Sequence, residues 1–164
     1  TLVQTAALDT VRLHLASTPM ASTLAPTLEY SWVHAYSACT HEWEGQTKIR
    51  AGIWQRIAPS KRFGSILQND DIIAVGLGVL DGDWLGIFSM ATRLDHRRQG
   101  WAQAIIGSLV TWAIESGSHN VYLQVAADNA TAIRLYRSIG FRTAYQYHYR
   151  HSNTKTQSAQ EPVI

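Results

Sequence analysis

The spacing of apolar residues changes across residues 97–102. Before this stretch, Trp84–Thr92 is a short apolar run that follows the turn residues Gly82 and Asp83, which predicts a buried strand. After it, apolar side chains recur at the spacing of one helix face, at Ala102, Ile105, Ile106, Leu109, Val110 and Ala113. Gly117 provides a stop for that helix. The sequence therefore predicts a strand–loop–helix junction, which any fold of this chain must accommodate.

The loop of this junction has the composition of an anion site. The first N–H groups of a helix have no partner within the helix, and the helix dipole favours a negative charge beside them. Gly100 leaves room for a ligand to approach the backbone, and Arg97 and Arg98 add positive charge. A phosphate group suits this arrangement. The alternative is an ordinary solvated arginine turn, and these six residues alone do not decide between the two.

A second motif lies downstream. The uncharged segment 120–126 predicts an interior strand, and residues 130–138 predict a helix that Asp128 or Asn129 can cap. The motif is N-x-x-A-x-x-L-Y followed by G-F, formed by Asn129, Ala132, Leu135, Tyr136, Gly140 and Phe141. Arg97-x-x-Gly100-x-Ala102 resembles the pyrophosphate-binding loop of the GNAT acetyltransferase superfamily, and the downstream motif resembles that family's second signature. Together the two cover about residues 84–150.

The resemblance implies an α/β (α+β) fold with three αβα layers, in which a mixed, largely antiparallel twisted sheet has helices on both faces. It also implies acetyl-CoA as cosubstrate, with no metal. In the family, a bulge in the strand that matches Trp84–Thr92 presents backbone N–H groups to the cofactor. The cofactor-binding residues implied are Met90, Thr92, Arg97, Arg98, Gln99, Gly100, Trp101, Ala102, Asn129 and Ala132.

The chemistry implied is direct attack of a primary amine on the thioester. Tyr136 matches the family's tyrosine, and its phenol, with a pKa near 10, can give a proton to the leaving thiolate. The alternative for Tyr136 is packing alone, and the alternative for Asn129 is a helix cap. The family often uses a glutamate as general base on the strand that matches Trp84–Thr92, where this chain has none. The unplaced candidates for a base are Asp81, Asp83, Glu29, His34 and His148.

Two functions remain open at this stage. One is an acetyl-CoA-dependent N-acetyltransferase that acts on a small-molecule or peptide amine. The other is a catalytically silent acyl-CoA-binding regulatory domain of a tandem protein. The intact Tyr136 and the intact loop favour the enzyme, whereas the missing carboxylate favours the silent domain.

Composition narrows the partners. The chain has 164 residues and a net charge of only +2, which argues against nucleic acid and against an anionic membrane. Cys39 is the single cysteine, so a reducing compartment such as the cytoplasm is expected, and the thiol is interpreted as buried or incidental. No metal-ligand spacing occurs among the seven histidines. A monomer or homodimer is expected.

Residues 1–27 are interpreted as an N-terminal strand and linker, or as the end of a preceding domain. In the second case residues 2–7 are expected to pair outside the main core or with another copy. The acetyltransferase domain is expected over residues 28–150, followed by a polar disordered tail at 151–164.

Other segments of the chain predict further elements. The expected helices are 28–42 and 47–57, broken at Glu44 and Gly45, and the expected strands are 62–68, 72–80 and 141–150. Gly76 and Gly78 suggest a bulge or a close approach of another backbone. Three tryptophans spaced eleven residues apart are expected mainly in the core: Trp32, Trp43 and Trp54.

Overall fold

The computed structural model describes residues 1–17 and 22–148. The strands are β1 (Leu2–Ala7), β2 (Thr23–Ala25), β3 (Lys61–Gln68), β4 (Asp71–Asp81), β5 (Trp84–Thr92), β6 (Asn120–Val125) and β7 (Arg142–Gln146). The helices are α1 (Leu8–Leu15), α2 (Tyr30–Thr40), α3 (Glu44–Arg56), α4 (Trp101–Glu115) and α5 (Ala130–Ser138), with a 3-10 turn η1 at Leu94–His96. The predicted strand–loop–helix junction is therefore confirmed as β5, η1 and α4.

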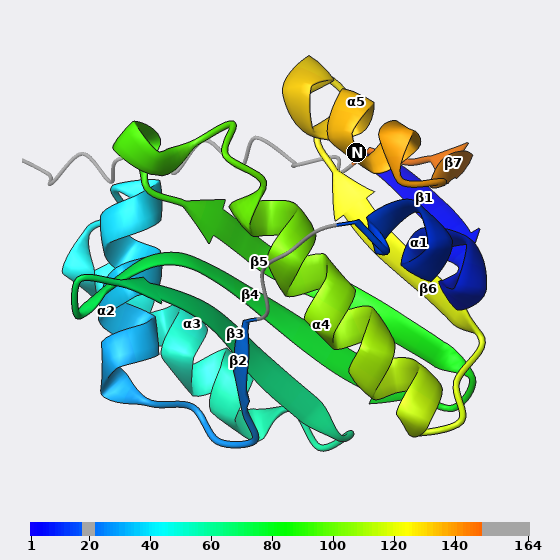
Figure 1. Ribbon diagram of the computed structural model, residues 1–164. Coiled ribbons are helices and arrows are strands. Elements are labelled where there is room, and N and C mark those ends of the chain that lie inside the picture. The colour runs from blue at the N-terminus through cyan, green and yellow to red at the C-terminus, as the bar shows by residue number, and fades with distance from the viewer. Residues whose placement is uncertain (18–21, 149–164) are drawn as a thin grey trace, which may run out of the picture.

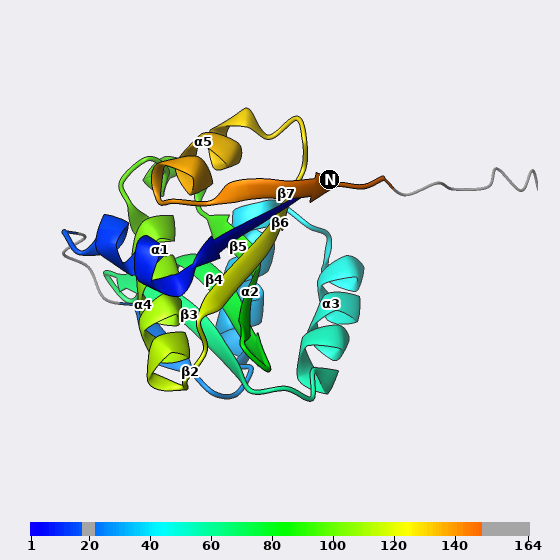
Figure 2. The ribbon, with the colours of Figure 1, turned by 90° about the vertical axis from the view of Figure 1, so that its right-hand side faces the viewer.

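All seven strands form one sheet in the order β2-β3-β4-β5-β6-β1-β7. β5 and β6 run parallel, whereas the other neighbouring pairs are antiparallel. Helices α1 and α4 lie on one face of the sheet, and α2 and α3 lie on the other (Figures 1 and 2). The expected three-layer fold with a mixed, largely antiparallel sheet is thus confirmed.

Each face of the sheet has its own apolar core. Under α4, Ile105, Ile106 and Leu109 are fully buried against strand residues. Under α2 and α3, Trp32, Trp54 and Phe63 pack together with their rings edge to face. α4 packs so tightly on β4 that a Cβ on Gly78 would lie 2.7 Å from Cδ2 of Leu109, so the close approach comes from side chains of α4.

The N-terminal segment belongs to this sheet. β1 lies between β6 and β7 and is paired antiparallel with both. Helix α1 follows without a break and buries Leu8, Val11 and Leu15 in the core beneath α4. The expectation that residues 2–7 pair outside the core is therefore wrong, because β1 is bonded along both edges and α1 fills apolar space beside α4. A domain boundary at residue 27 stays a prediction.

The two helices on the second face begin and end differently from the prediction. α2 ends at Thr40, and His41 follows in the left-handed region with φ 56°. α3 already begins at Glu44, so the predicted break at Glu44 and Gly45 is wrong, and both residues lie in the first helical turn. Trp43 stands at this corner and is 69% exposed, so the expectation of a core position fails for it.

The C-terminal strand is shorter than predicted. β7 ends at Gln146 rather than at residue 150, and its pairing with β1 includes a register shift. Tyr145 pairs with Val3 of β1, and Tyr147 lies just past the end of β7, where its backbone N–H donates to the Thr1 carbonyl at 3.0 Å. The predicted tail at 151–164 and Tyr149 lie outside the described residues. No helix of the described ranges is long and apolar enough to cross a membrane.

Candidate functional site

Two parallel strands at the middle of the sheet separate part-way along their length. β5 pairs with β6 only from Trp84 to Ile87, although β5 continues to Thr92. Just past Ile87, two residues of β5, Ser89 and Met90, face the single residue Gly76 of β4, and Ser89 has φ 50°. This β-bulge turns β5 away from its neighbour. The bulge expected from the resemblance is present in β5, and it lies opposite Gly76 rather than in the strand of that glycine.

A cavity of about 1030 Å³ lies where the strands separate. Its walls are the end of α2, the end of β5, the loop through η1, the first turn of α4 and the start and inner face of α5. The lining residues are Cys39, Thr40, His41, Met90, Ala91, Thr92, Leu94, Asp95, His96, Arg97, Arg98, Gly100, Trp101, Ala102, Gln103, Asn129, Thr131, Ala132, Leu135 and Tyr136.

One end of the cavity is suited to an anion. Gly100 is the N-cap of α4 and has φ 88°, a backbone region in which other residues are strained. Its carbonyl accepts the first helical bond, from the Ala104 N–H at 3.0 Å. The N–H groups of the first turn therefore point toward the loop, and α4 directs the positive end of its dipole there. Arg97 closes the loop by donating from Nε to the Thr92 carbonyl at 3.2 Å.

Nearly all the predicted cofactor residues lie together around this cavity. Met90, Thr92, Arg97, Arg98, Gly100, Trp101, Ala102, Asn129 and Ala132 line it, as does the predicted catalytic Tyr136. Gln99 does not line it, and its side-chain oxygen accepts a hydrogen bond from Trp101 Nε1 at 3.3 Å. Asn129 lines the cavity, as a cofactor-binding residue would, and it also caps α5, where its side-chain oxygen accepts a hydrogen bond from the Ala132 N–H at 3.1 Å.

Tyr136 reaches the cavity from α5. Its side chain is 8% exposed and packs against the ring of Phe141, with the ring centroids 5.9 Å apart. Burial raises the pKa of its phenol above the ordinary value near 10, so the hydroxyl carries its proton at neutral pH. Within the described residues, that hydroxyl has no hydrogen-bond partner. A buried donor that faces a cavity is available to a bound molecule.

Sequence reasoning missed the contribution of α2. Cys39, Thr40 and His41 close one side of the cavity, and no local motif marks them. Burial raises the pKa of the Cys39 thiol, and its sulfur lies 3.8 Å from the Ile73 carbonyl oxygen, which fits the buried thiol expected from the sequence. In the same loop, His96 Nδ1 lies 2.8 Å from Asp95 Oδ1, and this neighbour lowers the pKa of the Asp95 carboxyl.

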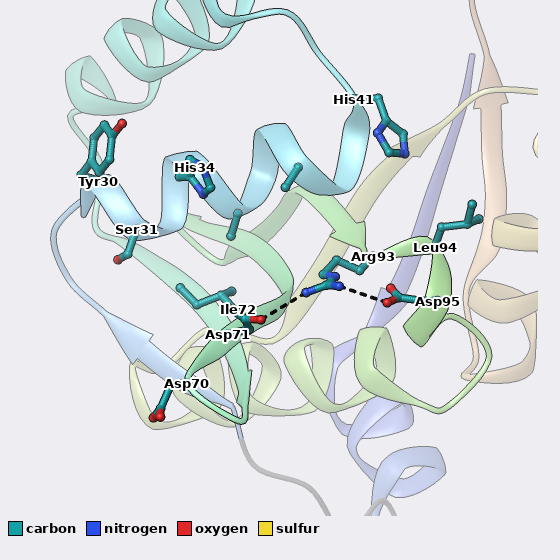
Figure 3. A pocket seen from close by; sticks show the side chains of 12 residues that line it. Tyr30, Ser31, His34, His41, Asp70, Asp71, Ile72, Arg93, Leu94 and Asp95 are labelled. Carbon is teal, nitrogen blue, oxygen red and sulfur yellow. Dashed lines mark hydrogen bonds and ion pairs between the residues drawn. The ribbon is translucent and has the colours of Figure 1, made fainter.

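A second cavity of about 950 Å³ adjoins the first and shares His41, Leu94 and Asp95 with it (Figure 3). Arg93 lies across it and forms ion pairs with Asp71 at 3.5 Å and with Asp95 at 3.0 Å. The backbone N–H of Arg93 also donates to the Ile73 carbonyl at 2.9 Å. Arg93 therefore ties the start of the β5–α4 loop to the start of β4.

The candidates for a general base lie elsewhere. Asp81, Asp83, Glu29 and His148 do not line either cavity, and His34 lines only the second. The Asp83 carboxylate is held by the backbone and ring nitrogens of His119 and by the Asn120 amide. Within residues 1–17 and 22–148, no cluster of three or more His, Cys, Asp or Glu side chains could hold a metal ion.

Comparison with known proteins agrees with this geometry. The family model described as "Acetyltransferase (GNAT) family" matches residues 25–141. A Bacillus subtilis protein named "Uncharacterized N-acetyltransferase YobR" is 32% identical over 99 residues, which cover 60% of this chain and 40% of that protein. The Escherichia coli ribosomal protein bS18-alanine N-acetyltransferase is 33% identical over 79 residues, 48% of this chain and 53% of that protein. The matched part is thus about half of each relative, or less.

Solved structures share the fold. The crystal structure of the Escherichia coli ribosomal-protein-S18-alanine N-acetyltransferase superposes with a TM-score of 0.58 at 27% identity, covering 73% of this chain and 76% of that one. The aminoglycoside acetyltransferase AAC(6')-Iy, solved with a bisubstrate analogue of CoA, superposes with a TM-score of 0.63 at 8% identity, covering 80% and 97%. The second likeness concerns the fold alone. On the family match, the motifs and the separated strands, this chain belongs to the GNAT acetyltransferase family.

Proposed function

We propose that this chain is an N-acetyltransferase that binds acetyl-CoA in the cavity between β5 and α5 and transfers the acetyl group to a primary amine. The observation that carries the proposal is the combination, in one cavity, of a helix N-terminus led by Gly100 and a buried tyrosine whose hydroxyl has no hydrogen-bond partner among the described residues. The first binds a pyrophosphate through backbone N–H groups. The second supplies a proton where charge develops on sulfur.

The cofactor would lie along the cavity from the loop to the strand opening. Its pyrophosphate is assigned to the backbone of residues 98–102, with Arg97 and Arg98 adding charge. Its pantetheine arm is assigned to the strand opening, beside Met90, Thr92, Asn129 and Ala132. N–H groups of the bulged part of β5 then face the thioester carbonyl and stabilise its oxyanion.

The reaction conserves atoms and charge as follows. An ammonium acceptor first loses one proton to solvent, since an alkyl amine is mostly protonated at pH 7. The neutral nitrogen attacks the thioester carbon, the C–S bond breaks, and the nitrogen loses a second proton to solvent. Tyr136 gives its proton to the departing thiolate and is reprotonated from solvent. The products are an acetamide and the free thiol of CoA.

The acceptor belongs to the class of small-molecule or peptide amines, and one relative is named for the alanine of ribosomal protein bS18. The single cysteine of the chain agrees with action in a reducing compartment such as the cytoplasm. Because β5 lacks the carboxylate that the family often uses as a base, the alternative function is a silent domain that binds acyl-CoA without turnover. Release of free thiol from acetyl-CoA, measured over a panel of amines, separates the two. Amine-dependent release supports the enzyme, whereas CoA binding without release from any amine supports the silent domain.

A further inference from the structure

One face of the sheet near the strand opening is rich in aromatic side chains. On β6, Val121, Leu123 and Val125 are buried in the core under α4, so Tyr122 and Gln124 face the opposite side. The same side of the sheet carries four further aromatic residues, two on β5, one on β7 and one just past the end of β7. We call this set the aromatic face, and it consists of Trp84, Phe88, Tyr122, Gln124, Tyr145 and Tyr147.

The rings of this face are packed but remain accessible. The ring of Tyr122 lies 6.2 Å from that of Trp84 and 5.8 Å from that of Phe88, both edge to face. A Cβ on Gly86 would lie 2.9 Å from the Tyr122 hydroxyl, so glycine leaves space for these rings. Trp84 is 39% exposed and Tyr145 is 60% exposed. α2 and α3 cover β3, β4 and part of β5, where Phe88 packs against their core, and α3 stands apart from β6, β1 and β7 (Figure 2).

Gln124 lies on this side at the strand opening, next to the part of the site to which the proposed function assigns the thioester. The last pair between β5 and β6 is Ile87 with Leu123, and Gln124 is the next residue of β6. Its side chain is exposed, and its Oε1 accepts a hydrogen bond from the Tyr147 hydroxyl at 2.9 Å. An amide oxygen has two lone pairs, so one remains for a second donor. The Tyr147 bond fixes the orientation of that oxygen.

The charges on this face lie away from Gln124. Asp81 pairs with Trp84 at one end of the face, and it contributes, after burial, to the raised pKa of Tyr122. Arg142 pairs with Thr5 of β1. Among the described residues of this face, the strand register places no carboxylate beside Gln124. A neutral oxygen surrounded by rings suits one amine on an apolar body, whereas a polycation would lack counter-charges there.

We propose that the aromatic face binds the acceptor, and that the acceptor is a primary amine with a single positive charge attached to an aromatic or branched apolar group. The amine donates to Gln124 Oε1, and its apolar group packs on Trp84, Phe88 and Tyr122. Gln124 is a positioning and specificity residue, because an amide does not take up the amine's proton. This inference rests on the proposed function and names its substrate class.

The test measures kcat/KM for acetyl transfer from acetyl-CoA to three amines. Phenethylamine is a small primary amine with one charge and one aromatic ring. A peptide amide that begins with phenylalanine carries the same groups at its N-terminus, and spermidine is the polycation. We expect at least one apolar amine to exceed spermidine by about tenfold or more, since burial of a ring of this size supports such a factor. If spermidine equals or exceeds both, the inference is overturned while the proposed function stands. Thiol release from none of the amines would instead overturn the proposed function.

Two variants test the role of Gln124 itself. Gln124→Leu keeps the size of the side chain and removes the acceptor oxygen, so KM for the preferred amine should rise about fivefold or more, with CoA affinity unchanged. Gln124→Glu adds a carboxylate and should shift the ratio of kcat/KM toward spermidine. Gln68→Leu, at an exposed site at the end of β3, is the matched control and should change neither value. An unchanged KM and an unchanged ratio in both Gln124 variants would refute the assignment.

Discussion

Replacement of Gly100 by valine tests the anion site most sharply, because the chain contains a matched control. Gly100 has φ 88° at the N-cap of α4, and Gly117 has φ 85° just beyond the C-terminal end of the same helix. Both glycines adopt the left-handed region, which costs an L-residue roughly 1–2 kcal/mol. A Cβ on Gly117 would meet no atom within 4 Å. Gly117→Val therefore reproduces the backbone strain at the helix end that does not line the cavity.

The two variants should differ in binding and not in strain. We expect each to lose about 1–2 kcal/mol of unfolding free energy through the backbone alone. Gly100→Val should also displace the first-turn N–H groups and place a branched side chain against the phosphates. Loss of two hydrogen bonds to a charged group, at about 1.5 kcal/mol each, amounts to roughly 3 kcal/mol, or about a hundredfold in affinity for CoA. Gly117→Val should bind CoA as the wild type does.

Isothermal titration calorimetry with CoA supplies the measurement, at a temperature at which circular dichroism shows both variants to be folded. The strain is expected to lower Tm similarly in the two variants. If Gly100→Val and Gly117→Val bind CoA with the same affinity, the pyrophosphate does not lie on the N-terminus of α4, and the reasoning from the loop geometry is refuted.

Three further predictions concern the scaffold and its ionisation. Leu8→Ala in α1 should cost about 2–5 kcal/mol by chemical denaturation, because Leu8 is 1% exposed, while Leu13→Ala, at 72% exposed, should stay within about 0.5 kcal/mol; equal effects would remove α1 from the core. Asp83→Asn should lower Tm at neutral pH. The hydrogen bond from His119 lowers the folded-state pKa of Asp83, so the ionised carboxylate stabilises the fold above the unfolded-state pKa near 3.9, and this stability is lost as pH falls through the folded-state pKa. The Tm values of wild type and variant should therefore converge in acid, and a difference in Tm that persists there contradicts this. Burial raises the pKa of Tyr136, so the folded state loses stability as pH rises above about 10, and Tyr136→Phe should lose less in pH-dependent denaturation; parallel pH curves would argue against burial of the phenol.

The central part of the fold follows from local sequence signals. The bounds of β5 and α5 are the predicted ones, and α4 spans the predicted helix face. These segments carry strong periodicity with glycine or asparagine at their ends, so local preference and tertiary packing agree. The same agreement explains why the cavity residues next to the two motifs could be named in advance.

The N-terminal segment shows what sequence reasoning does not reach. β1 is an interior strand of the sheet because β6 and β7 pair with its two edges, and those partners lie more than a hundred residues away. No local pattern encodes such a pairing, and the short run Leu2–Ala7 reads equally well as an appendage. The exposed Trp43 has a similar cause, because the corner after His41 turns it outward.

The residues of the proposed acceptor site escaped prediction for the same reason. Gln124 meets Tyr147 only through the order of strands β6, β1 and β7, and Cys39 meets the cavity only through the packing of α2 on β4 and β5. Sequence motifs indicate a cofactor site because the cofactor approaches the backbone at a single loop. An acceptor is held by side chains from several strands, and their proximity is a property of topology.

The measurement that tests the central claim most directly is single-turnover acetyl transfer by wild type and Tyr136→Phe, with CoA affinity measured beside it. The variant keeps the ring and its contact with Phe141 and loses only the hydroxyl. Because general acid catalysis contributes typically 10²–10⁴-fold, the account predicts a chemical rate lower by about a hundredfold or more at nearly unchanged CoA affinity. Equal rates in the two proteins would contradict it, since Tyr136 would then only pack beside the cavity.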